Sequence, residues 1–238
     1  MRKMIFSLRP TLLSFCIFAL TSVAAAQNSL DPGSVASATP VITYEQKWPA
    51  ADPSWYEISI DSSGNASYSS KALAKQGEDE SALPYVLKFI ASAQTRTQIF
   101  QLAKDLNQFN GNFETRAKIA QTGVKTLTYR NGEQQSHTSL NYSDNQQMNE
   151  LIGIFQRIST TLELAQKLDF DLRFDKLGLD RDLKSMERLE KDHQLAELQV
   201  IAPTLERISN DNGIMNIARQ RARRLLDQSR PEAAGANK

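Results

Sequence analysis

Histidine, the side chain most often used as a general acid or base, is scarce in this chain, which has only His137 and His193. A catalytic histidine needs a carboxylate that orients it and a nucleophile within reach. Neither can be identified beside His137, which falls in a predicted β-hairpin. We therefore interpret His137 as an ordinary strand residue and predict no catalytic residue.

Two further patterns are similar to metal sites. Glu190 and His193 have the Glu-x-x-His spacing that can bind a metal from one helix face. Such sites use the pattern on two helices and the chain has one copy, so we interpret it as solvated helix surface. The aspartate-rich stretch 169–182 suggests a calcium loop, but an EF-hand needs an acceptor and a glycine where Arg173 and Phe174 stand. We predict no metal site and no cofactor.

Four arginines form the densest basic cluster, on one predicted helix: Arg219, Arg221, Arg223 and Arg224. Cations near the C-terminal end of a helix complement its dipole, which would make the cluster ordinary surface. Alternatively, Arg219 and Arg223 could bind an anionic group such as the carboxylates of a partner protein. No aromatic side chain that could stack on bases accompanies them, so we expect no nucleic-acid partner.

The two tryptophans, Trp48 and Trp55, bracket a loop that contains Pro49 and Pro53. Tryptophan on a rigid loop is a common interface anchor, because it adds a large apolar area at low entropic cost. Trp48 continues the alternation of the preceding strand and is expected to cap the core, whereas Trp55 is out of phase with the core-facing residues that follow. Both are candidate partner-binding residues, and Trp55 is the favoured one.

The first 26 residues have the organisation of a secretory signal peptide: a positive start, an apolar segment from Thr11 to Leu20, and small residues before a cleavage predicted after Ala26. The apolar segment is shorter than the ~20 residues that span a bilayer. Cys16, the only cysteine, lies inside it, so the mature chain has no disulfide. We expect a secreted or periplasmic bacterial protein that is not an integral membrane protein.

Residues 27–40 are small, polar and interrupted by proline and glycine, which is typical of a flexible linker. Alternating apolar residues then predict strands at 41–48, 56–60 and 66–70. The apolar run Pro84–Ala91 fits either a fourth strand or the start of a helix. We favour a strand, because Ser92 or Thr95 can cap a helix that begins after it.

Residues 123–142 predict a β-hairpin closed by Asn131-Gly132, a pair that tolerates φ > 0 at both turn positions. This register sets Arg130 opposite Glu133. It places four larger side chains on the core-facing side: Leu127, Tyr129, Leu140 and Tyr142.

An apolar stripe from Met148 to Ala165, with a cap at Ser143 or Asp144, predicts a long helix that covers the hairpin. Three more helices are predicted in the C-terminal part: Asp180–Leu198, Ala202–Ser209 and Ile214–Gln228. The predicted fold is α+β, with a small antiparallel sheet of five or six strands covered by two helices (41–170). A helical C-terminal unit (171–228) and a disordered tail (229–238) follow.

Two parts of the chain resemble known families. The order strand, strand, strand, helix, hairpin, long helix across 41–168 is similar to that of emfourin-type metalloprotease inhibitors, which implies inhibitor-like binding. Residues 201–226 resemble one HEAT-type helical hairpin, on the positions Pro203, Asn210-Asp211, Ala218, Ala222 and Leu225. The whole chain also resembles secreted bacterial α+β proteins, a likeness that implies no activity.

The chain contains no G-x-S-x-G, H-E-x-x-H, P-loop or dinucleotide-binding motif. We therefore predict a non-catalytic binding or interaction protein rather than an enzyme, with another envelope or secreted protein as its partner. The alternative is an envelope hydrolase that uses paired carboxylates, which the sequence does not identify.

Overall fold

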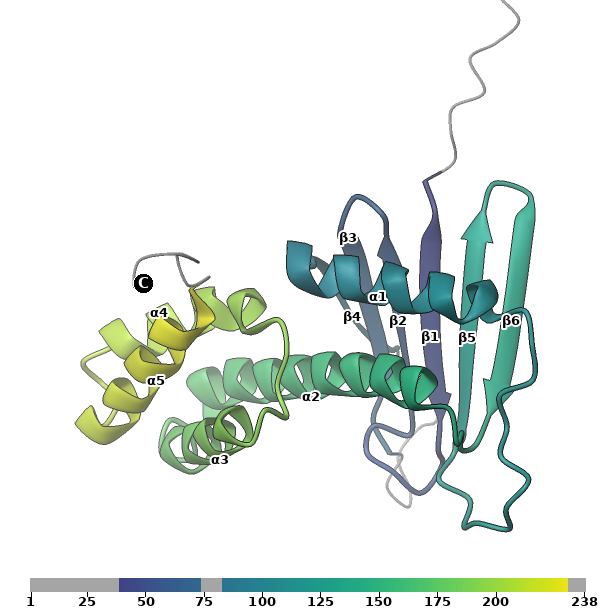
Figure 1. The fold of residues 1–238 in the computed structure, drawn as a ribbon. Coiled ribbons are helices and arrows are strands. Elements are labelled where there is room, and N and C mark those ends of the chain that lie inside the picture. The colour runs from purple at the N-terminus through teal and green to yellow at the C-terminus, as the bar shows by residue number, and fades with distance from the viewer. Residues whose placement is uncertain (1–38, 74–82, 231–238) are drawn as a thin grey trace, which may run out of the picture. The chain divides into compact units, whose positions relative to one another are not determined.

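The computed structural model describes residues 39–73 and 83–230. The predicted signal peptide (1–26) and nearly all of the predicted linker (27–40) and tail (229–238) lie outside these residues. Within the described part, six strands and five α-helices form the predicted α+β fold, with the helical C-terminal region at one end of the chain (Figure 1).

Alternation of apolar and polar side chains builds one antiparallel sheet with the strand order β4-β3-β2-β1-β5-β6. Its strands are β1 (Val41–Lys47), β2 (Trp55–Asp61), β3 (Asn65–Lys71), β4 (Tyr85–Ile90), β5 (Val124–Asn131) and β6 (Gln134–Leu140). The ambiguous segment Pro84–Ala91 is thus a strand, and it lies at the sheet edge beside β3.

The hairpin between β5 and β6 forms, but its predicted register is wrong by two residues. Asn131 pairs with Gln134, so the turn residues are Gly132 and Glu133. Gly132 has φ +61 and Asn131 has no positive φ, which fits a turn with glycine at its first central position. A two-residue slip keeps every side chain on its face, so Leu127, Tyr129 and Leu140 are buried as predicted. Tyr142 lies beyond the strand and is 46% exposed.

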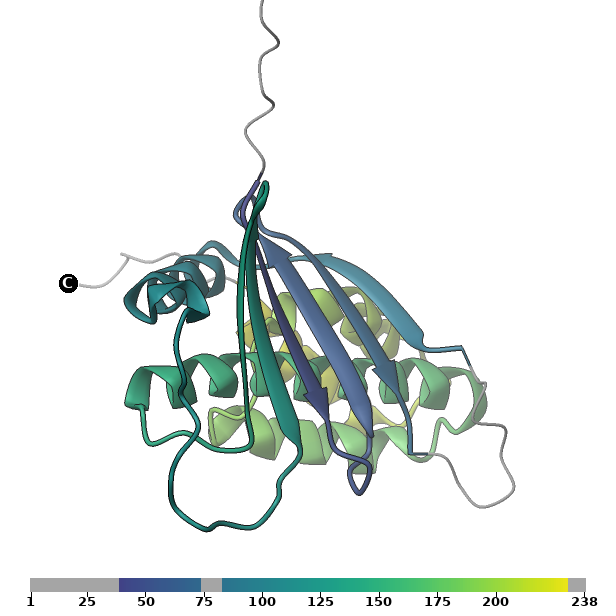
Figure 2. The same cartoon turned by 90° about the vertical axis from the view of Figure 1, so that its right-hand side faces the viewer.

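Two helices cover one face of the sheet (Figures 1 and 2). Helix α1 (Ala93–Asp105) begins at the predicted cap, Ser92, whose side chain accepts a hydrogen bond from the Thr95 amide. Helix α2 (Gln146–Phe174) is capped by Asn145 rather than by Ser143 or Asp144, because the Asn145 side chain accepts from the Met148 amide. None of the described helices covers the other face.

The C-terminal helices are α3 (Leu179–Lys191), α4 (Ala202–Asn210) and α5 (Asn216–Ser229). Two 3-10 turns complete the described elements, η1 (Asn107–Phe109) and η2 (Leu198–Ile201). The predicted helix 180–198 is therefore too long. His193 has φ +55 just beyond α3, so it does not share a helix face with Glu190.

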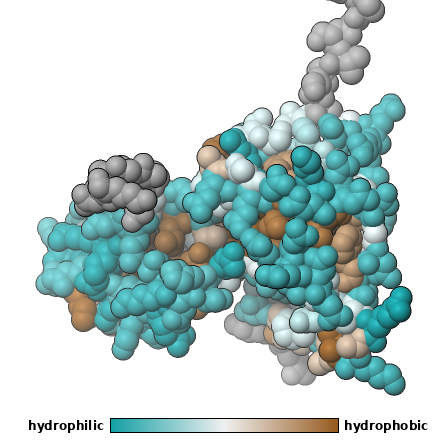
Figure 3. All heavy atoms as spheres, viewed as in Figure 1, coloured by the Kyte–Doolittle hydropathy of each residue, from teal (hydrophilic) through white to brown (hydrophobic). Residues whose placement is uncertain are grey.

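The apolar core has two parts joined by α2. Side chains from Met148 to Leu162 pack against the sheet and α1, while Ala165 and Leu168 pack among α3, α4 and α5. On the face drawn in Figure 3 the surface is largely hydrophilic, and hydrophobic residues show between the C-terminal helices and the sheet-bearing part. Helix α2 therefore positions residues toward both parts of the molecule.

Candidate functional site

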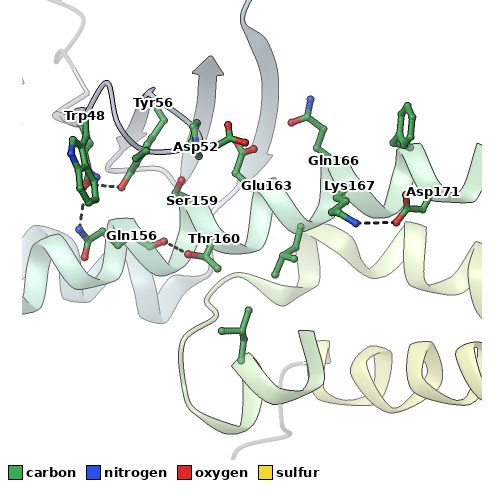
Figure 4. Close-up of a pocket in the computed structure, with 16 residues that line it drawn as sticks. Trp48, Asp52, Tyr56, Gln156, Ser159, Thr160, Glu163, Gln166, Lys167 and Asp171 are labelled. Carbon is green, nitrogen blue, oxygen red and sulfur yellow. Dashed lines mark hydrogen bonds and ion pairs between the residues drawn. The ribbon is translucent and has the colours of Figure 1, made fainter. Parts of the chain in front are cut away.

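A pocket of about 840 Å³ lies where the loop between β1 and β2 meets α2 and α3 (Figure 4). We call it the Trp48 pocket. Its lining residues come from the end of β1 and the start of β2 with the loop between them (Gln46, Trp48, Ala51, Asp52, Pro53, Tyr56), from α2 (Gln156, Ser159, Thr160, Glu163, Leu164, Gln166, Lys167, Phe170, Asp171) and from α3 (Leu189). Its size is that of a ligand site.

The loop that carries Trp48 is held by main-chain hydrogen bonds. The Trp48 amide donates to the Ser54 carbonyl at 2.9 Å, and the Ala51 amide donates to the Trp48 carbonyl at 2.9 Å. Gly123 (φ +88) lies beneath Trp48, and a Cβ at this position would stand 2.5 Å from the Trp48 Cβ. Trp48 is 36% exposed and belongs to neither core cluster of the described residues, so it forms a wall of the pocket and does not cap the core as the sequence predicted.

Three donors converge on one amide oxygen at the inner side of the pocket. Gln46 Oε1 accepts hydrogen bonds from Tyr44 at 2.7 Å, from Tyr56 at 3.0 Å and from Gln156 at 3.3 Å. Burial raises the pKa of Tyr56 to about 12 and raises the pKa of Tyr44 as well. Both phenols are therefore neutral donors at physiological pH, and the amide–phenol cluster is fixed in place.

Glu163 supplies a carboxylate next to this cluster. The Tyr68 hydroxyl donates to Glu163 Oε1 at 2.5 Å and lies 3.0 Å from the Ser159 hydroxyl. Burial raises the pKa of Tyr68, and the nearby negative charge of Glu163 raises it further. The described hydrogen bonds use Oε1 of Glu163, and its side chain is partly exposed where it lines the pocket. A carboxylate oxygen therefore faces any group that enters.

Lys167 is paired at the far end of the pocket. Its ammonium lies 3.4 Å from Asp171 and also contacts Asp182 of α3. Burial raises the pKa of Asp171, and contact with Asp182 raises it further. Burial acts on Asp182 too, but hydrogen bonds with Asp171, Arg181 and Lys167 outweigh it and lower the pKa of Asp182 to about 2. Asp182 therefore carries the charge that balances Lys167.

The two predicted tryptophans do not share a site. Trp48 lines the pocket, whereas Trp55 lies on the opposite face of the sheet, where its Nε1 donates to Glu45 Oε1 at 2.8 Å. Successive strand residues point to opposite faces. Trp55 therefore lies on the outer face of the sheet, and its neighbour Tyr56 lies on the face that the helices cover. His137 is exposed on the same outer face as Trp55.

The arginine cluster lies on α5. Arg219 donates to the Asn212 side chain at 2.8 Å, and Arg223 donates to the Ser209 carbonyl at 3.3 Å. The other two arginines bind acidic residues of α3. Arg221 pairs with Asp180 and Glu187, and Arg224 pairs with Glu187. Half of the cluster thus fastens α5 to α3, and none of the four arginines lines the Trp48 pocket.

Sequence reasoning missed the polar residues of α2. Gln156, Thr160, Glu163 and Lys167 follow one another at helical spacings of three and four, so they form a polar stripe beside the apolar one. That spacing could have identified the polar stripe from the sequence. It did not show that the loop between β1 and β2 would close over the stripe.

Within the part of the chain that the structure describes, no helix has the length and apolar character to cross a membrane. The same residues include no group of three or more His, Cys, Asp or Glu side chains placed to hold a metal ion. No protein-family model matches the chain, and comparison with curated proteins finds no match. Any function assigned to the protein therefore rests on its own residues.

Proposed function

We propose that the protein is a non-catalytic binding protein that takes a segment of another protein into the Trp48 pocket. The observation that carries the proposal is an exposed aromatic pair at the pocket edge. Phe170 lines the pocket and is 58% exposed, and its ring centroid lies 5.0 Å from that of Phe174, which is 72% exposed. Leu177, 76% exposed, follows in the turn between α2 and α3.

Exposed apolar side chains next to a pocket mark interaction sites, because their burial by a partner removes apolar area from water. The Phe170–Phe174 pair thus extends the apolar surface beyond the Trp48 pocket itself. The predicted signal peptide supports a partner among envelope or secreted proteins.

The test is site-specific crosslinking in the envelope fraction. A photo-crosslinking residue at Gln166, which is exposed and lines the pocket, is compared with one at Gln135, which is exposed on the outer sheet face. We expect a partner to be captured at position 166, not at 135, and to be lost when Trp48→Ala or Phe174→Ala is added. Equal capture at both positions, or no capture at 166, would contradict the proposal.

One observation favours the hydrolase alternative: three carboxyl groups, those of Asp52, Glu163 and Asp171, line the same pocket. The two functions differ in the fate of the captured partner. If the protein only binds, the partner stays intact after prolonged incubation with it, as judged by intact-mass spectrometry. If the protein is a hydrolase, the partner is cleaved, and Glu163→Gln or Asp52→Asn stops the cleavage.

A further inference from the structure

We propose that the partner inserts a lysine or arginine side chain into the Trp48 pocket, an inference that rests on the proposed binding function. The charges that line the pocket are unequal, with three carboxyl groups, those of Asp52, Glu163 and Asp171, against one ammonium, that of Lys167. Lys167 is already paired with Asp171 and with Asp182 behind it. The ion pairs found among the described residues include neither Asp52 nor Glu163.

Asp52 and Glu163, which pair with no cation among residues 39–73 and 83–230, approach the pocket from different elements. Asp52 lies on the loop between β1 and β2, and Glu163 projects from α2 toward the sheet, where it accepts from Tyr68 (Figure 4). A cleft lined by one sign of charge raises the local concentration of the opposite charge. A cation placed between the loop and α2 would lie near both carboxylates.

The walls suit the rest of such a side chain. Trp48, Tyr56 and Phe170 provide aromatic surface, and Leu164 and Leu189 provide aliphatic surface. Lysine and arginine bury their methylene stems against apolar groups and keep the charged head in polar surroundings. Aromatic faces also attract cations. The pocket thus combines apolar walls for the stem with carboxylates for the charged head.

A neutral sugar is the main competing occupant, because aromatic rings and amides such as Gln46, Gln156 and Gln166 also fit hydroxyl groups. The excess of carboxylates decides between them. A sugar would bring no countercharge to Asp52 and Glu163, while an ammonium or guanidinium group would bring one and donate hydrogen bonds to the same carboxylates.

The experiment uses Trp48 fluorescence in the full mature chain carrying Trp55→Phe, so that the signal comes from the pocket. The probe is a blocked peptide with the sequence Gly-Phe-Lys-Gly, and its matched control carries acetyl-lysine. We expect saturable binding of the lysine peptide and at least about tenfold weaker binding of the acetylated one. Raising the salt concentration from about 50 mM to about 500 mM should weaken binding of the lysine peptide and leave binding of the acetylated peptide unchanged.

Two variants test the carboxylates. Glu163→Gln and, separately, Asp52→Asn on the exposed loop should each lower the affinity for the lysine peptide several-fold. Glu45→Gln on the outer sheet face has no effect. Circular dichroism and thermal melting check that each variant folds.

Three results would overturn the inference: equal affinity for both peptides, no binding of either up to about 10 mM, or a fluorescence change with chitotriose in place of the lysine peptide. Capture of a partner at position 166 together with any of these would leave the binding function standing. Failure of both experiments would remove the function as well.

Discussion

Two aspartates that contact Lys167, at the far end of the Trp48 pocket, show how surroundings separate chemically identical groups. Asp171 and Asp182 both face Lys167, yet the pKa of Asp171 is raised and that of Asp182 is lowered to about 2. The difference between the two pKa shifts follows from the charged neighbours, because Asp182 also forms an ion pair with Arg181. The ionised form of Asp182 therefore stabilises the fold, whereas ionisation of Asp171 is less favourable in the folded protein than in the unfolded chain.

This asymmetry predicts opposite effects of removing the two charges. A lowered pKa gives a stabilisation that is complete above the ordinary aspartate value near pH 4 and is lost as pH falls toward about 2. Asp182→Asn should thus lower the free energy of unfolding by about 1–2 kcal/mol at pH 7, and the loss should be smaller at pH 3. Asp171→Asn should change it little or raise it.

Urea unfolding of both variants at pH 7 and pH 3 measures these effects. An equal loss of stability in the two variants, or a loss from Asp182→Asn that is unchanged at pH 3, would show that the two aspartates do not differ as described.

Among the elements, the β5–β6 hairpin shows where local sequence rules hold and where they fail. Alternation predicted both strands and their buried faces, since a two-residue slip leaves the faces unchanged. The turn rule for Asn-Gly did not fix the register, because Gly132 also satisfies a turn that needs positive φ at its first central position only. Contacts from distant residues act on the strand too: the Ser136 hydroxyl donates to the Gln108 carbonyl.

The observed register makes a prediction about the turn. Gly132→Ala should lower the free energy of unfolding by about 1 kcal/mol, because alanine resists positive φ. Asn131→Ala should cost less, because Asn131 is the last residue of β5 and has no positive φ. Chemical denaturation of the two variants compares them directly, and a larger loss for Asn131→Ala would support the turn at 131–132 instead.

Contacts between segments that are distant in sequence also explain why the Trp48 pocket could not be predicted. Trp48 itself was identified as a candidate, but the pocket joins the loop between β1 and β2 to α2 and to Leu189 of α3. These segments are far apart in sequence, and no short motif encodes their meeting. Only the tertiary packing, with Tyr44 stacked on Phe155 at 5.0 Å, brings the loop over the polar stripe of α2.

At the scale of the whole molecule, Glu197 ties the C-terminal helices to the sheet-bearing part. It lies just before η2 and is 6% exposed. Its carboxylate accepts from the Ser92 amide at 2.7 Å and from the Ser92 hydroxyl at 2.8 Å, at the start of α1. Anions at a helix N-terminus are favoured by the unpaired amides and the helix dipole.

Glu197→Ala should therefore destabilise the protein by about 1–3 kcal/mol, since the partly buried Ser92 donors lose their partner. We also expect a single unfolding transition in the variant and in the parent protein, because α2 contributes to both parts of the core. Calorimetry gives both results. Two separate transitions would instead support the predicted division into 41–170 and 171–228.

The central place of β1 in the sheet has a consequence for the order in which the protein can fold. Thr43 pairs with Ser59 on one side and with Thr128 on the other. As the chain emerges N-terminus first, from a ribosome or from an export channel, β2 appears soon after β1, whereas β5 appears only after β3, β4 and α1. Until then one edge of β1 offers unpaired amides and carbonyls to any passing strand. The nascent chain is thus most exposed to mispairing between the emergence of Ile60 and that of Val124, and folding is slowed by this long-range closure.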